Sequence, residues 1–239
     1  MCQLRRSRQW LARFYQAAPA VQAQYPTDRF LLLTLTVRNP QPKDLRATLQ
    51  EMSKAWKRLS LSKEFRAVRG FIRSTELTRG ADGSVHPHFH VLLQVRPSYF
   101  AADYVKQSDW VAAWRSAMRL DYDPTVDIRR IKPVKDAPEG LSPSLAGAVE
   151  VLKYTAKGSD LLADAAWTDT IMTQTHRLRF LATGGVWKDV MAEDDEDTPT
   201  DLNESAPDET DPVWLWGFHA IARRYESVGQ SARSRQKAA

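Results

Sequence analysis

Cysteine is almost absent from this chain, and Cys2 is the only example among 239 residues. A single thiol excludes a disulfide framework or a cysteine-rich zinc site within one chain, and the lack of disulfides suits a reducing compartment. No apolar run is long enough to cross a membrane, and the arginine-containing first twenty residues lack the apolar core of a signal peptide. We therefore expect a cytoplasmic protein with no membrane partner.

Lysine and arginine are missing from residues 193–211, which hold ten acidic side chains. The whole chain has a formal net charge of +5, so the remainder without this stretch carries +15. A surface this basic suits a polyanionic partner, nucleic acid first; the plainer explanation is charge that keeps the protein soluble. The acidic composition predicts a disordered linker over residues 191–212.

Hydrophobic periodicity predicts the elements of the fold. Apolar residues alternate through "RFLLLTLTVRNP" (29–40), as in a half-buried strand, and recur at spacings of three and four through 43–60, as in an amphipathic helix. The same patterns predict strands at 68–78, 85–95, 125–131 and 176–182, and helices at 103–120 and 142–157. This order predicts an α+β fold, a central antiparallel sheet with helices packed mainly on one face.

Two further segments flank this region. Residues 1–28 predict an N-terminal basic helix over Leu4–Ala18 that Pro19 interrupts. Residues 213–239 predict a short aromatic helix, up to Tyr225, followed by a basic tail.

Three of the five histidines lie in "VHPHFHVLLQV" (85–95), at alternating positions. Strand side chains alternate between faces, so His86, His88 and His90 share one face. Neutral imidazoles are common transition-metal ligands, and two at this spacing can chelate one ion. The plainer explanation is a solvated polar face.

A hairpin would bring a carboxylate to the same face. "RGADGS" (79–84) has the glycines of a tight turn, and a turn centred on Asp82 sets Glu76 directly opposite His88. Glu76 with two imidazoles suits Mg²⁺ or Mn²⁺. A slip of one residue would move Glu76 to the other face, where it would be an ordinary surface glutamate.

Either His86 and His88 or His88 and His90 could form the imidazole pair. Pro87 makes the His86 end of the strand irregular, which favours His88 and His90 as ligands and His86 as an accessory residue.

The helix predicted at 142–157 carries a second stripe, made of Glu150, Tyr154 and Lys157 at spacings of four and three. Taken alone, this stripe indicates a packing aromatic beside a solvated ion pair. Beside a metal site in a basic protein it allows another interpretation. The Tyr154 hydroxyl could attack a phosphodiester, Lys157 could stabilise the phenolate, and Glu150 could act as a general base for water.

Three stretches resemble the HUH-type replication initiators of small rolling-circle plasmids, the family often called Rep_1. "FLLLTLTVRNP" is similar to the first family motif, "HPHFHVLLQV" to the HUH motif and "EVLKYTAKGSD" to the tyrosine motif. They follow the family order, and the similarity covers residues 29–185. The resemblance implies an HUH/RRM-like nickase domain, which we place at residues 29–190.

The resemblance also implies a reaction, that of a site-specific single-strand DNA endonuclease and strand transferase. Tyr154 would attack one strand of a plasmid origin, leaving a 5′-phosphotyrosine link and a 3′-OH that primes rolling-circle replication. His88 and His90 would hold the divalent metal, Mg²⁺ or Mn²⁺, with Glu76 at the acidic third-ligand position. Lys157 completes the Tyr-x-x-Lys motif, and Glu150 fits the acidic residue that activates water in single-tyrosine members.

The implied partners are plasmid origin DNA, single-stranded or extruded as a hairpin at the nick site, with a host helicase, a host polymerase and a second copy of the chain as further candidates. The implied location is the bacterial cytoplasm, on the nucleoid or plasmid. Residues 127–135 and the N-terminal arginines are candidate phosphate contacts. Tyr99 and Phe100 could stack on bases, with a core or loop role as the alternative.

Other functions use the same features. A transposase or mobilisation relaxase would share the chemistry, a DNA-binding regulator would share only the fold, and a metal-dependent hydrolase would form no covalent link. Some Rep_1 members carry cysteine pairs that suggest a zinc element, which Cys2 alone cannot form.

Overall fold

The structure, a computed structural model, describes residues 3–132, 134, 141–146, 164–191, 213–219 and 224–231. The chain divides into two units, Met1–Ala192 and Glu193–Ala239, and each is described by itself. Nearly all of the predicted acidic linker, residues 192–212, lies outside the described residues.

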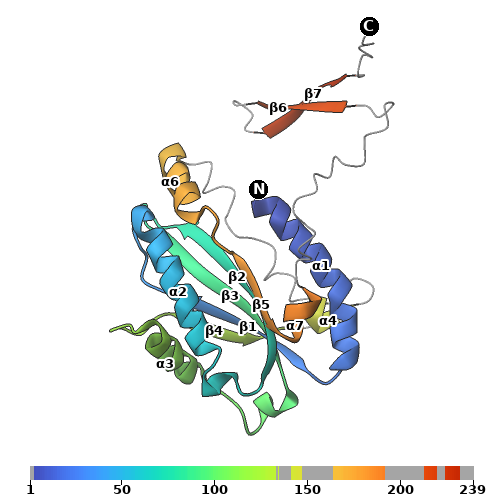
Figure 1. Cartoon of the computed structure of the whole chain (residues 1–239), viewed down its shortest axis with the longest axis vertical. Helices are drawn as coiled ribbons and strands as arrows, with labels where there is room; N and C mark the ends of the chain where they lie inside the picture. The colour runs from blue at the N-terminus through green and yellow to red at the C-terminus, as the bar shows by residue number, and fades with distance from the viewer. Residues whose placement is uncertain are drawn as a thin grey trace. The chain divides into compact units, whose positions relative to one another are not determined.

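A five-stranded antiparallel sheet forms the centre of the first unit, with strand order β4-β1-β3-β2-β5 (Figure 1). The strands are β1 (Arg29–Thr36), β2 (Val68–Arg79), β3 (Val85–Val95), β4 (Val126–Arg130) and β5 (Leu181–Gly185). The predicted α+β fold with an antiparallel sheet is confirmed. β5 begins later than the expected strand at 176–182, because Arg177 has a left-handed backbone (φ 58°) that interrupts an extended segment.

Three helices cover one face of this sheet, which we call the helix-covered face. They are α2 (Leu45–Leu59), α3 (Gln107–Met118) and α6 (Ala165–Thr175). Short 3-10 helices precede or follow α2 and α3 in the chain: η1 (Pro42–Asp44), η2 (Lys63–Phe65) and η3 (Pro97–Phe100). The larger core lies here: Leu33, Leu35 and Val91 of the sheet are fully buried, as are Trp110 and Trp114 of α3. In Figure 1, α2 and α3 lie side by side over the sheet.

A smaller core covers one end of the opposite face. Helices α1 (Gln3–Gln24), α4 (Pro143–Ala146) and α7 (Val186–Val190) gather there (Figure 1). Phe14 of α1 stacks on Trp187 of α7 with ring centroids 5.5 Å apart, above Ile72 and Leu92 of the sheet. The other end of this face carries the three histidines, so we call it the histidine face.

α1 does not stop at Pro19. The helix continues to Gln24, so the predicted break at Pro19 is wrong. Pro19 itself is exposed, whereas Ala18 and Val21 on either side are buried in the smaller core. Packing of this continuous apolar stripe outweighs the loss of one helical hydrogen bond at the proline.

α6 was not anticipated from the sequence. Its buried residues are few, chiefly Trp167 and Ile171, so the helical period is weak. The side chain of Asp164 caps its first turn by accepting a hydrogen bond from the Trp167 amide at 3.0 Å. Arg79 at the end of β2 also contacts Asp164, at 2.8 Å, and this ion pair ties α6 to the hairpin.

The second unit contains two antiparallel strands, β6 (Val213–His219) and β7 (Arg224–Ser231). The aromatic helix predicted here is therefore wrong. Val213–His219 alternates aliphatic and aromatic residues, a period of two that suits a strand better than a helix.

Candidate functional site

The β2–β3 hairpin places the predicted metal ligands. Gly83 takes a positive φ of 81°, and Asp82 accepts hydrogen bonds from the amide and hydroxyl of Ser84 at 3.0 and 2.5 Å. This turn centres the hairpin on Asp82, as predicted, and sets Glu76 directly opposite His88. Directly opposed residues project from the same face. The condition on which Glu76 depended as a candidate ligand is therefore met.

His90 is held at both ring nitrogens. Its Nε2 lies 2.7 Å from Oε2 of Glu76 on β2, and its Nδ1 lies 3.1 Å from the hydroxyl of Thr34 on β1. Both side chains of the His90–Glu76 pair are largely buried, at 25% and 18% exposed. A carboxylate can only accept, so Nε2–H donates to Glu76. If Nε2 held a cation instead, the single ring proton would lie on Nδ1, which would then donate to the Thr34 hydroxyl.

His88 lies between the other two histidines. Its ring centroid is 4.1 Å from that of His86 and 5.7 Å from that of His90. All three imidazoles are half-buried on the histidine face. Glu76 contacts His90, whereas His86 lies at the start of β3, on the far side of His88 from His90. The accessory role of His86 stays a prediction.

The predicted ligands share a patch without forming a finished coordination shell. Among the residues that the structure describes, no three His, Cys, Asp or Glu side chains are grouped closely enough to hold a metal ion. The donors nevertheless fit a divalent cation, because a carboxylate and an imidazole already meet and a second imidazole lies beside them on the same face. The metal site stays a prediction that these contacts support.

The tyrosine motif lies outside the described residues, so the positions of Glu150, Tyr154 and Lys157 are not described. The start of the predicted helix is described. Ser142 caps it, because its hydroxyl accepts a hydrogen bond from the Leu145 amide at 3.3 Å. Leu145 is fully buried in the smaller core with Leu92 of β3. The helix therefore begins on the histidine face.

The candidate DNA contacts divide into two groups. Tyr99 is 2% exposed and its hydroxyl accepts a hydrogen bond from Nε1 of the buried Trp110 at 3.2 Å, so it packs in the core and does not stack on bases. Phe100 is 44% exposed, with Arg130 5.6 Å from its ring. Arg129 is exposed on β4, where its Nε contacts Asp127.

Comparison with known proteins identifies the family. The Rep_1 model, described as "Replication protein", matches residues 1–222. The chain belongs to the Rep_1 family of replication proteins.

Individual Rep_1 relatives agree. A "Protein rep" of Lentilactobacillus hilgardii is 32% identical over 198 residues, which cover 80% of this chain and 62% of the relative. A "Protein rep" of Bacillus amyloliquefaciens is 35% identical over 181 residues, covering 69% of this chain and 53% of the relative. A "Replication protein" of Staphylococcus aureus is 33% identical over 177 residues, which cover 70% of this chain and 74% of the relative. The chain spans little more than half the length of the first two. No solved structure matches.

Within this Rep_1 chain, two of the three motif stretches fall on neighbouring strands. "FLLLTLTVRNP" covers β1 and "HPHFHVLLQV" covers β3, and the two strands pair with Thr34 opposite His90. The sequence did not single out Thr34, because the pairing of β1 with β3 cannot be read from either strand alone.

Among the described residues, no helix combines the length and apolar character needed to cross a lipid bilayer.

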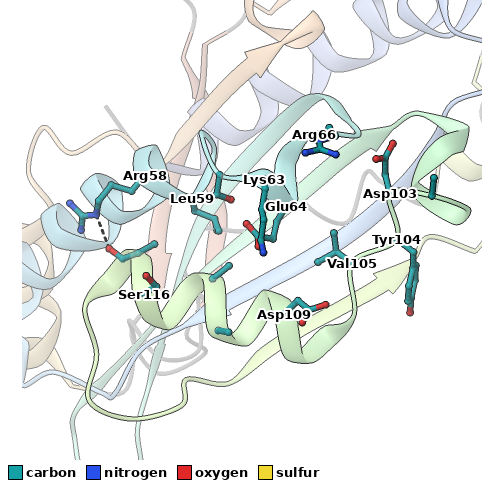
Figure 2. A pocket seen from close by; sticks show the side chains of 15 residues that line it. Arg58, Leu59, Lys63, Glu64, Arg66, Asp103, Tyr104, Val105, Asp109 and Ser116 are labelled. Carbon is teal, nitrogen blue, oxygen red and sulfur yellow. Dashed lines mark hydrogen bonds between the residues drawn. The ribbon is translucent and has the colours of Figure 1, made fainter.

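A hollow of about 680 Å³ lies between the end of α2 and α3 on the helix-covered face (Figure 2). Arg58 there donates to the Ala117 carbonyl at 2.7 Å. Its charged lining is balanced, with basic Arg58, Lys63 and Arg66 facing acidic Glu64, Asp103 and Asp109. This hollow does not present charge of one sign, and it lies away from the histidines.

Proposed function

We propose that this Rep_1 chain initiates plasmid replication by nicking one strand of the origin. Tyr154 would form a 5′-phosphotyrosine link and release a 3′-OH, which a host polymerase extends behind a host helicase, and the chain would then rejoin the strands. The observation that carries the proposal is the 2.7 Å contact of Glu76 with His90 on the face that also bears His88.

Each residue would have a defined task in the reaction. Glu76, His88 and His90 would hold Mg²⁺ or Mn²⁺, which supplies polarisation of the scissile phosphate. The Tyr154 oxygen would bond to phosphorus as the bond from phosphorus to the 3′ oxygen breaks. The phenol proton passes to water, and the departing 3′ oxygen takes up a proton. Lys157 would stabilise the phenolate.

The start of α4 supports the pairing of this tyrosine with the histidines. From Leu145 to Tyr154 a helix would advance about 13 Å, at 1.5 Å per residue. From Leu92 to His88, β3 covers about 13 Å. Leu145 and Leu92 belong to the same buried cluster, so a helix that continued from Leu145 along β3 toward His88 would carry Tyr154 to the level of the histidines.

DNA would be held mainly through its phosphates. The chain has a formal charge of +15 outside residues 193–211, and binding through Lys and Arg weakens as salt is added. Arg129 is a candidate contact because its neighbours in register place it on the histidine face of the edge strand β4. A single-stranded or hairpin substrate would expose the scissile phosphate to Tyr154.

The proposal is tested by a covalent adduct on a denaturing gel after incubation with single-stranded origin DNA and Mn²⁺. We expect adduct from the wild type, none from Tyr154→Phe, and none from His90→Ala. Tyr104→Phe is the matched control, because Tyr104 is 60% exposed and lies outside the proposed site. Adduct that persists in Tyr154→Phe would reject the nucleophile. No adduct from any form would favour a DNA-binding regulator or a hydrolase without a covalent step.

Glu150 has a separate task in the proposal, because a single tyrosine needs a water to end the reaction. Glu150→Ala should form the adduct as the wild type does but release it more slowly, by about tenfold or more. Glu150→Gln should behave in the same way. The decay of isolated adduct is the measurement, and unchanged decay in both variants would remove Glu150 from the mechanism.

A further inference from the structure

A second pocket lies on the helix-covered face, on the other side of the sheet from the histidines. It has a volume of about 540 Å³ and is formed by α2, the middle of β2 and β3, and the segment before β5. Its polar lining comes from α2 and two arginines, and its floor is aromatic. We call it the Arg73 pocket. Its lining residues are Leu49, Gln50, Ser53, Lys54, Arg73, Thr75, Phe89, Leu178, Arg179 and Phe180.

Arg73 is a buried cation in this pocket. It is 4% exposed, and its guanidinium lies 4.1 Å from the ring centroid of Phe89 and 5.8 Å from that of Trp56. Its Nε is buried without a hydrogen-bond partner, and no carboxylate in the described part of the chain forms an ion pair with it. Burial lowers the pKa of Arg73 to about 10, and the neighbouring Arg179 contributes to the same shift.

The rest of the lining adds positive charge and no negative charge. Arg179 is exposed at the rim, and Lys54 lies on the α2 side, where it also contacts the exposed Glu51 at 2.6 Å. None of the ten lining residues is acidic. The hollow in Figure 2 differs, because its basic residues face an equal number of acidic ones. A buried guanidinium whose Nε has no hydrogen-bond partner, with a second arginine beside it, is suited to an anion.

We propose that the Arg73 pocket binds a phosphate group, contributed either by a nucleic-acid backbone or by a free mononucleotide. Arg73 would donate from the floor of the pocket, with Arg179 and Lys54 at its rim. Guanidinium groups match phosphate oxygens in geometry, and a buried one gains most from an anion because water does not screen it. The amide of Gln50 and the hydroxyl of Ser53 line the same space. This site goes beyond the proposed nicking reaction, because it lies on the opposite face of the sheet.

The test is calorimetric titration of the full chain, without divalent metal or origin sequence, with dTMP and with a twelve-nucleotide oligo(dT). Thymidine, which has no phosphate, should not bind. Arg73→Met keeps the length and apolar stem of the side chain, and Arg179→Gln changes an exposed residue. Each should weaken binding about tenfold or more. For oligo(dT), the slope of log K against log salt should become shallower by about 0.7 for each phosphate that the variant no longer binds.

Arg177→Gln is the matched control, because Arg177 is an exposed arginine of the same segment that does not line the pocket. If the Arg73 and Arg179 variants bind both ligands more weakly, the pocket accepts phosphate from either source. Weaker binding of oligo(dT) alone assigns the nucleic-acid backbone, and weaker binding of dTMP alone assigns the free nucleotide. If neither Arg73→Met nor Arg179→Gln weakens either ligand, or Arg177→Gln weakens them equally, the proposal is wrong. Should Arg73→Met not fold, Arg179→Gln and Lys54→Gln decide alone. Since the titrations need no nicking, they can fail while the adduct assay succeeds, and the reverse.

Discussion

His90 has two neighbours that fix the direction of its ring. Glu76 contacts Nε2 and Thr34 contacts Nδ1, so the ring cannot turn without breaking one of the two hydrogen bonds. Partners on the second ring nitrogen commonly orient a metal-binding histidine. Thr34 is therefore the positioning residue of the proposed metal site, and Nε2 is the nitrogen that would face the cation.

Thr34→Val keeps the shape of this side chain and removes its hydroxyl. We expect Mn²⁺ affinity to fall by about tenfold or more, since loss of an orienting partner typically costs that much. Thr34→Ser keeps the hydroxyl and should retain the affinity. Titration of Mn²⁺ by electron paramagnetic resonance, with no DNA present, gives the affinity directly. Equal Mn²⁺ affinity in Thr34→Val and the wild type would show that Thr34 does not position His90.

Burying the charged guanidinium of Arg73 costs the folded chain free energy. A pKa lowered from its ordinary value to about 10 corresponds to about 3 kcal/mol against the charged form at neutral pH. Stacking on Phe89 offsets part of this cost, by about 2 kcal/mol for a buried cation on an aromatic ring. The remaining penalty is what a bound phosphate would relieve. Sequence patterning cannot reveal this, because Arg73 stands between Ile72 and Ser74 in β2, and nothing in that order indicates that its side chain is buried.

Among the elements, the β2–β3 hairpin and α2 could be predicted closely. The turn "RGADGS" fixed both strand ends and the pairing of Glu76 with His88, because the register of a hairpin follows from its turn. α2 was predictable from its strong helical period. α6 and the strands β6 and β7 were not predicted, because α6 buries few apolar residues and the period of two at 213–219 extends over too few residues to exclude a helix.

The junction between β5 and α7 depends on a glycine. Gly185 has a φ of +59°, and a Cβ there would collide with the Arg69 carbonyl oxygen and lie 2.7 Å from the Gly70 Cα of β2. Gly83, in the hairpin turn, also has positive φ (+81°) but open space around it. The two positions thus share the backbone conformation and differ in packing.

Gly83→Ala should cost about 1–2 kcal/mol of unfolding free energy, from the positive φ alone. Gly185→Ala should cost at least about 2 kcal/mol more, because β5 must move away from β2 to admit the methyl group. Chemical denaturation of the two variants beside the wild type measures both values. Equal costs would mean that the packing of β5 against β2 is looser than the structure shows.

At the scale of the whole molecule, the acidic stretch is separate from the part of the chain that holds the proposed sites. Ten acidic residues lie in 193–211, and the remainder is strongly basic. The first unit holds the sheet, the histidine face and the Arg73 pocket. The sequence predicted the sheet, the shared face of Glu76, His88 and His90, and the family. It could not predict Thr34 or Arg73, whose surroundings arise only when distant strands pair.

The most direct test of the account is to find which residue carries the DNA. The adduct formed with origin DNA and Mn²⁺ should be digested with nuclease and trypsin and mapped by mass spectrometry. We predict one nucleotide-bearing peptide, containing Tyr154, which lies between the cleavage points Lys153 and Lys157. Attachment at any of the other six tyrosines, or at a residue that is not tyrosine, would contradict the account.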